Sequence, residues 1–368
     1  ADVTINGMSD VAVEANDSYP NFNQQLTIND CYNGIIINGG ESRFNVVTID
    51  NPSHINNNLG IQLNRTSSIF DGPITANNNS NGIKITEGTN ATFNGPVNTN
   101  YNTGGGSEGN AYGILITRSN ANFNSEVTSI DNSNTRTQDF ENTTNNIFIT
   151  ESSNVTFNST VATEGNASPE YQHNTGIRVD NFSNFTSYGN INSSNHQEAL
   201  VISNFSNANF YGSIIINDDR NFSHLSEGIK VNNGSNANYY NKIQIQHLTQ
   251  SAINVNYGSV ATFQDEVTAI NNESGIFVNN GTASFLAKPV LDANRYGINI
   301  NGSDSKINFS TDLLITNNIL AGIFISNGAD INLPNNITIY TEPNRYNSKG
   351  IVLYNSRANL SGEIQFNL

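Results

Sequence analysis

The densest group of chemically versatile side chains in this sequence is a pair of adjacent carboxylates, Asp218 and Asp219, followed by Arg220 and His224. Glycoside hydrolysis uses two carboxylates about 5 to 9.5 Å apart, so this group is the first candidate for catalysis. The other histidines are scattered along the chain, and no Ser/His/Asp arrangement accompanies them. The chemistry to be tested is therefore glycan cleavage at one short segment.

The paired aspartates resemble those of polygalacturonases, but the Asn-Thr-Asp, Gly-His-Gly and Arg-Ile-Lys segments of those enzymes are missing here. No acidic pattern recurs in a way that supplies the oxygen ligands that calcium needs in polysaccharide lyases. We therefore expect no catalytic residue, no metal site and no cofactor. A glycan-degrading enzyme stays open as an alternative.

The elements that position these side chains follow from a repeat. An apolar triplet, usually after a glycine, recurs thirteen times, as in Gly82-Ile83-Lys84-Ile85, with starts about 22 to 33 residues apart. An aromatic residue and then an aliphatic residue follow each triplet, as in Phe93 to Val97. A self-similar period of this length is typical of solenoids. Because side chains alternate along a strand, each repeat is predicted to form three short strands joined by turns.

The predicted fold is all-β, a right-handed single-stranded parallel β-helix of about 14 rungs with three short strands each. We expect one domain over residues 1–368, in which residues 1–30 form an N-terminal cap and a degenerate first rung. The polar residue after each triplet, such as Asn38 or Thr117, is expected to form an internal ladder. Long edge-loop insertions are predicted between a third strand and the next triplet, near residues 98–112, 128–145, 162–175, 217–227 and 340–349.

Composition restricts the partners. A formal net charge of −16 argues against nucleic acid and against anionic membranes. One cysteine, Cys31, excludes an intrachain disulfide framework. No apolar run approaches the ~20 residues that span a bilayer. The start at Ala1 is compatible with cleavage of a signal peptide, so we expect an exported protein.

The segment Gly-Ile-Leu-Ile…Ala-Asn-Phe-Asn-Ser-Glu-Val at 113–127, and Ala-Thr-Phe-Asn-Gly-Pro-Val at 91–97, resemble passenger domains of AIDA-type autotransporters of Gram-negative bacteria. The likeness runs from about residue 30 to the end of the chain. It implies a non-enzymatic adhesin at the bacterial cell surface, exported through the periplasm and anchored by a C-terminal β-barrel absent from this chain. It also implies binding of host glycosaminoglycans and of fibronectin or a similar matrix protein. Self-associating members of the family, which promote aggregation and biofilm, suggest the alternative.

The middle residue of each triplet is expected to point outward, and this column contains cations and aromatic residues, among them Phe148. Tyrosines from the insertions are expected beside it, where rings and cations together suit an anionic glycan. The competing interpretation is that the cations only neutralise nearby carboxylates. The predicted glycan-binding residues are Lys84, Tyr101, Tyr112, Arg118, Tyr171, Arg178 and Lys230.

A second predicted surface lies just before the aliphatic residue of the third strand, on a flank without long insertions. It is expected to dock an extended protein, either fibronectin or a second copy of this chain. The competing interpretation is that spaced charges keep the solenoid soluble and prevent lateral strand pairing. The predicted residues of this protein-partner face are Glu126, Lys242, Asp265, Glu266, Lys288 and Asp312.

Overall fold

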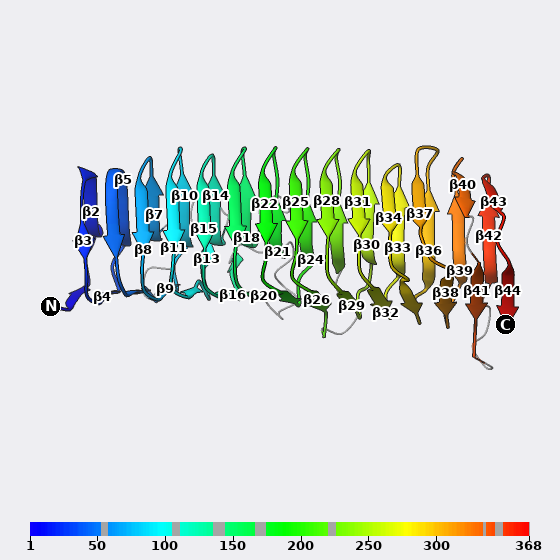
Figure 1. The fold of residues 1–368 in the computed structure, drawn as a ribbon. Coiled ribbons are helices and arrows are strands. Elements are labelled where there is room, and N and C mark those ends of the chain that lie inside the picture. Colours follow the sequence, from blue (N-terminus) through cyan, green and yellow to red (C-terminus); the bar gives the residue numbers. More distant parts are fainter. Residues whose placement is uncertain are drawn as a thin grey trace. The chain divides into compact units, whose positions relative to one another are not determined.

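The computed structural model describes residues 1–52, 58–104, 111–134, 144–165, 174–219, 226–333, 336–342 and 349–367. Among these residues the regular elements are strands that pair in parallel, and no helix is long and apolar enough to cross a membrane. The chain divides into two compact units, Ala1–Gln197 and Glu198–Leu368. In each unit, short strands stack coil upon coil (Figure 1). The predicted parallel β-helix is confirmed, while the single domain and the number of rungs stay predictions.

A coil of the first unit contributes a first, a second and a third strand, and each stacks on the strand of the same rank in the next coil. The first strands are β2 (Val11–Ser18), β5 (Asn33–Phe44), β7 (Leu59–Asn64), β10 (Asn81–Thr86), β14 (Tyr112–Thr117), β18 (Thr144–Thr150) and β21 (Asn174–Val179). The second strands are β3 (Asn21–Phe22), β8 (Ser67–Phe70), β11 (Asn90–Phe93), β15 (Asn120–Phe123), β19 (Asn154–Phe157) and β22 (Asn184–Ser187), and the long β5 continues into this rank. The third strands are β1 (Val3–Asn6), β4 (Leu26–Asn29), β6 (Val47–Asp50), β9 (Ile74–Asn77), β12 (Val97–Asn98), β16 (Val127–Ile130), β20 (Val161–Glu164) and β23 (Ile191–Ser194). A short extra pair joins β13 (Thr103–Gly104) to β17 (Ser133–Asn134).

The second unit has the same three ranks. Its first strands are β24 (Glu198–Ile202), β27 (Glu227–Val231), β30 (Ser251–Asn256), β33 (Ser274–Asn279), β36 (Tyr296–Asn301), β39 (Ala321–Ser326) and β42 (Lys349–Tyr354). Its second strands are β25 (Asn207–Phe210), β28 (Asn236–Tyr239), β31 (Val260–Phe263), β34 (Thr282–Phe285), β37 (Lys306–Phe309), β40 (Asp330–Leu333) and β43 (Arg357–Leu360). Its third strands are β26 (Ile214–Asn217), β29 (Ile243–Gln246), β32 (Val267–Ile270), β35 (Val290–Asp292), β38 (Leu313–Thr316), β41 (Ile337–Tyr340) and β44 (Ile364–Asn367).

We call the corner between first and second strands the first turn, that between second and third strands the second turn, and that before the next first strand the third turn. The described residues on either side of the five predicted insertions lie at the third turn. Within the insertions, residues 105–110, 135–143, 166–173, 220–225 and 343–348 lie outside the described residues. At the N-terminus, β2 pairs with β5 so that Val13 lies beside Ile35, which makes it the first strand of an initial coil.

The core of each unit consists of stacked columns of like residues. Nearly all isoleucines at the first and third positions of the triplets are buried, as predicted, and so are nearly all aromatic residues of the second strands; Ile351 and Phe22 are half-buried. In the first unit the rings of Phe70, Phe93 and Phe123 stack with centroid distances of 5.0 and 4.6 Å. In the second unit Tyr239 and Phe263 stack at 4.8 Å. Stacking like on like buries these rings against one another, so the repeat itself builds the core.

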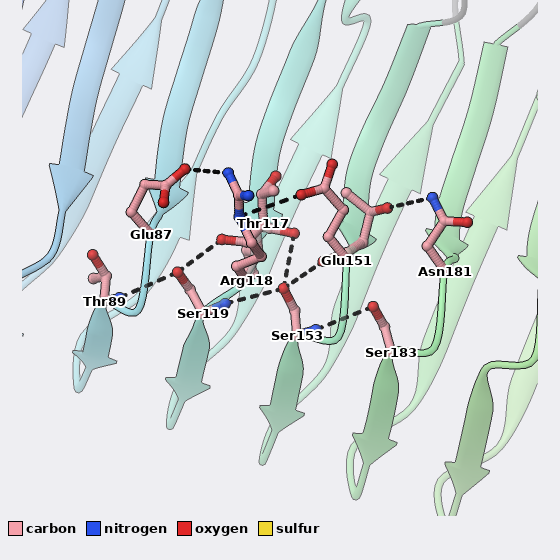
Figure 2. Close-up of polar contacts among 11 residues, drawn as sticks. Glu87, Thr89, Thr117, Arg118, Ser119, Glu151, Ser153, Asn181 and Ser183 are labelled. Atoms are coloured by element: carbon pink, nitrogen blue, oxygen red, sulfur yellow. Dashed lines mark hydrogen bonds and ion pairs between the residues drawn. The ribbon is translucent and has the colours of Figure 1, made fainter.

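Buried turns are held by polar ladders, because a buried backbone N–H needs an acceptor. At the first turn, the backbone N–H of Ser119 donates to the Ser153 Oγ at 3.2 Å, and Ser153 donates likewise to Ser183 (Figure 2). At the third turn, the Asn102 N–H donates to the Asn132 Oδ1 at 3.0 Å. The ladder of the first turn lies about two residues beyond the expected column, in which Thr117 is half-buried. The expected column forms a ladder of its own in places, since the Asn38 amide donates to the Asn16 Oδ1 at 2.9 Å and the Asn301 amide donates to the Asn279 Oδ1 at 3.0 Å.

Candidate functional site

Three of the predicted glycan-binding residues of the first unit, Lys84, Tyr112 and Arg178, lie on its first strands. Backbone pairing places Lys84 beside Leu115, Leu115 beside Phe148, and Phe148 beside Arg178. Each step is one coil, about 4.8 Å, and all four side chains are half-buried. We call this row, together with Tyr112, the first-strand face. It has a cation at each end and apolar side chains between them.

Aromatic contacts hold this face together. The rings of Tyr112 and Phe148 stack with centroids 5.8 Å apart, and the Arg178 guanidinium lies over the Phe148 ring at 5.8 Å. Arg178 also forms an ion pair with the nearly buried Asp180 at 3.3 Å. An ordered aromatic pair with a cation at its edge offers a ring face for stacking and a donor for hydrogen bonding.

The sequence prediction did not assign two residues in or beside this face to a site. Phe148 was placed in the outward column but was not counted as a ligand contact, although it touches both Tyr112 and Arg178. Asn145 lies beside Tyr112 in register and is fully buried, and neither of its amide atoms has a hydrogen-bond partner among the described residues. An unpaired buried amide is costly. The alignment of repeats contained the signal for Asn145, since it occupies the position of Tyr112 one coil later.

The cations differ in their charge environment. In the part of the chain that the structure describes, Lys84 forms no ion pair. Arg118 lies at the first turn between Glu87 and Glu151 and pairs with both, the Glu151 contact being 3.4 Å (Figure 2). This geometry supports the competing interpretation for Arg118, and the Asp180 pair supports it for Arg178.

Lys230 of the second unit is the most strongly neutralised of these cations. Its Nζ lies 2.7 Å from a Glu198 oxygen and 3.0 Å from a Glu227 oxygen. Burial lowers the pKa of Lys230, but the negative charges of Glu227 and Glu198 outweigh it, so the net pKa is raised. The amide of Asn254 donates to Glu227 as well. Lys230 thus belongs to a closed charge network.

The two remaining predicted glycan contacts lie elsewhere. Tyr101 is exposed at the third turn with a positive φ of 56°, away from the first-turn position of Arg118. Tyr171 lies outside the described residues. The structure therefore brings Lys84, Tyr112 and Arg178 together, and it separates Arg118 and Tyr101 from them by placing each at a turn.

The residues predicted for the protein-partner face lie at the second turns. In the second unit, the register of the third strands aligns Lys242, Glu266, Lys288 and Asp312, one per coil, so their charges alternate in sign. Asp265 accepts a hydrogen bond from the Glu266 backbone N–H at 2.7 Å, which fixes that turn. Glu126 lies at the second turn of the first unit and is exposed. We call the aligned four residues the charge column.

The two adjacent carboxylates considered for catalysis lie in different environments. Asp218 is buried, whereas Asp219 is exposed and accepts a hydrogen bond from the Asn217 amide at 2.5 Å. Arg220 and His224 lie outside the described residues. Elsewhere in the described ranges, no group of three or more His, Cys, Asp or Glu side chains is placed to hold a metal ion.

Comparisons of the chain with protein-family models, with curated proteins and with solved structures found no match.

Proposed function

We propose that this protein is a non-enzymatic adhesin of the bacterial cell surface that binds extracellular-matrix glycans through the first-strand face. The observation that supports it most is the contact of Tyr112 and Arg178 with the same ring, Phe148, in a row that ends at Lys84. Sugar rings stack on aromatic faces, and their hydroxyl and acidic groups accept hydrogen bonds from cations.

The charge pairing restricts the ligand within this class. Glycosaminoglycans carry repeated anionic groups. Of the two cations in the row, however, Arg178 already has Asp180 as its partner, and only Lys84 lacks an ion pair among the described residues. The overall charge of −16 opposes a polyanion as well. A glycosaminoglycan is therefore expected to bind through ring stacking and about one ionic contact rather than through a basic stripe.

This proposal is tested with immobilised heparin and the variant Lys84→Glu. We expect affinity to fall about tenfold, because a hydrogen bond to a charged group contributes about 1.5 to 3 kcal/mol. The wild-type protein should show a log–log salt slope of about one, as for a single released counterion. Lys306→Glu is the matched control, because it makes the same charge change at an exposed lysine of the second unit. Equal losses in both variants would mean that only net charge matters, and the face would not be the site.

A second function, self-association, is favoured by the charge column. The order Lys242, Glu266, Lys288, Asp312 reads plus, minus, plus, minus along successive coils. In a second copy related by a two-fold axis, the column runs in the opposite direction, so each cation faces an anion of the other copy. A symmetric interface requires such a self-complementary surface. Each exposed pair contributes only about 0 to 1 kcal/mol, so such a contact would be weak and salt-sensitive.

Sedimentation velocity at low salt tests self-association. We expect concentration-dependent dimers of the wild-type protein, which disappear in the variant Lys242→Glu/Lys288→Glu. The opposite variant, Glu266→Lys/Asp312→Lys, should also be monomeric alone, and a mixture of the two should restore dimers. A wild-type protein that stays monomeric at its highest soluble concentration, but binds fibronectin through this column, would assign the face to a matrix protein instead.

A further inference from the structure

Two tyrosines of the second unit stack on each other at the second turn. Tyr211 is the first residue after β25, and Tyr240 is the first residue after β28. Their rings are nearly parallel, with an interplanar angle of 6° and centroids 4.4 Å apart. Tyr211 is 41% exposed and Tyr240 is half-buried. The pair is therefore an aromatic stack at the surface and not a part of the core.

The backbone and the core hold this tyrosine pair in register. The Tyr240 N–H donates to the Phe210 carbonyl at 2.8 Å, and the Asn241 amide donates to the Tyr211 carbonyl at 3.3 Å. One residue earlier in each coil, the buried rings of Phe210 and Tyr239 stack at 4.8 Å with an interplanar angle of 4°. Side chains at equivalent positions of paired strands point the same way. Equivalent atoms of the two surface rings therefore lie side by side.

Stacking restricts what this pair can do. Each ring covers one face of the other, so the pair presents ring edges and hydroxyl groups to solvent more than the open face that a stacking ligand needs. Partial desolvation and the neighbouring Tyr240 raise the pKa of Tyr211, so its phenol is protonated at neutral pH. The ring edge includes the Cε carbons beside the hydroxyl, at which tyrosyl radicals couple. The arrangement thus favours a reaction between the two rings over binding of a ligand.

The composition directs one-electron oxidation to tyrosine. The chain contains 14 tyrosines, no tryptophan, one methionine and one cysteine. The cysteine, Cys31, is buried, and oxidants react with accessible thiols. A radical formed on one ring of the pair lies beside a second phenol. Because groups held next to each other react far faster than separate molecules, coupling within the pair is favoured over coupling between proteins.

We propose that Tyr211 and Tyr240 form an oxidative crosslinking site, at which a haem peroxidase with hydrogen peroxide joins the two rings as dityrosine. Each phenol gives one electron to the peroxidase and one proton to water, which leaves a tyrosyl radical. The two radicals form one carbon–carbon bond between their Cε atoms. Each of these carbons then releases its hydrogen as a proton while the oxygen of the same ring takes up a proton, which restores both aromatic rings. The two electrons and two protons lost overall reduce one hydrogen peroxide to two water molecules.

The test treats the full chain with a haem peroxidase and hydrogen peroxide, and measures dityrosine by fluorescence and by mass spectrometry. Trypsin cleaves after Arg220 and Lys230, so Tyr211 and Tyr240 fall on separate peptides. We expect these peptides to be joined with the loss of two hydrogen atoms, and fragmentation to place the link at the two tyrosines. The yield per protein should stay constant over an about twentyfold dilution, as for a reaction within one molecule.

The key variants are Tyr240→Phe and Tyr211→Phe, because phenylalanine keeps the stacked ring and removes only the phenol. We expect the dityrosine yield to fall about tenfold in each. Tyr257→Phe is the matched control, since Tyr257 is 58% exposed and lies at a first turn, and this variant should react like the wild-type protein.

Three results would overturn the proposal. The first is a wild-type yield in Tyr240→Phe, which would mean that Tyr211 couples to another ring or not at all. The second is a yield that rises with protein concentration, because the link would then join separate molecules. The third is the absence of dityrosine in the treated wild-type protein. The tyrosine pair shares no residue with the first-strand face or the charge column, so none of these results bears on the proposed function.

Discussion

Lys84 and Lys230 occupy the same position of the repeat, the middle of the triplet on a first strand, yet their surroundings are opposite. Lys84 lies beside Gln62 and Leu115, with no ion pair in the described chain. Lys230 lies between Glu198 and Glu227 and is only 24% exposed. The repeat fixes where a side chain points, but the neighbouring coils decide whether its charge is available to a ligand.

The difference has a local cause three residues earlier in the strand. That position is Asn81 before Lys84, and Glu227 before Lys230. Because stacking is in register, Glu227 lies beside Glu198 of the adjacent coil, and two carboxylates in adjacent coils require a cation between them. In the first unit the corresponding neighbours are Leu59, Asn81 and Tyr112, which carry no charge. The lysine at this position therefore belongs to a charge network in the second unit, whereas in the first unit it forms no ion pair among the described residues.

Stability measurements on the two lysines should separate these roles, and they give the largest expected effect. Lys230→Met leaves Glu227, which is nearly buried, and Glu198 facing each other without a cation. Removing one partner of a fully buried pair costs about 3 to 5 kcal/mol, and partial exposure reduces this to about 2 to 3 kcal/mol. Urea unfolding of the second unit should measure this loss of unfolding free energy.

Lys84→Met is the matched control for this measurement. Because Lys84 has no ion pair to lose, the unfolding free energy of the Lys84→Met protein should differ from that of the wild type by no more than about 0.5 kcal/mol, as for ordinary surface substitutions. The triple variant Lys230→Met/Glu198→Gln/Glu227→Gln should recover most of the lost stability, since no unpaired charge remains. Equal destabilisation by both single variants would contradict the comparison.

The fold was predictable because its signal is repeated in every coil. Gly-Ile-x-Ile triplets and the following aromatic residue specify the buried columns, so an irregular copy hardly affects the assignment. The inner ladders were only partly predictable, because serine and asparagine are abundant throughout the chain. Ser153 and Asn132 gain their role from the turn that buries them, which the one-dimensional pattern does not specify.

The candidate site was less predictable for a related reason. Outward orientation of Lys84, Arg178 and Lys230 followed from strand alternation, but their ion pairs depend on which residues lie beside them in the next coil. That register requires insertion lengths to be assigned correctly first. Phe182 and Phe205 show what a comparison of copies adds, because both have positive φ at a first-turn position where several other copies have glycine. A substitution at a glycine-favouring position is visible in the sequence only after the turns are aligned.

The pH dependence of the Lys230 network gives a smaller effect with a definite sign. The Glu227 and Glu198 charges raise the pKa of Lys230 above its usual value despite burial, whereas an unfolded lysine titrates near 10.4. A group whose pKa is higher in the folded state contributes its full stabilisation below the unfolded pKa, and loses it as pH rises toward the folded pKa. The difference in unfolding free energy between wild-type protein and Lys230→Met should thus be constant from pH 8 to 10. Above about pH 10.4 it should shrink by up to about 1.4 kcal/mol per pH unit. If the difference grows between pH 8 and 10 instead, the pKa of Lys230 is lowered in the folded state, because burial then outweighs the charges of the two carboxylates. That result would contradict an electrostatic origin of the contrast with Lys84.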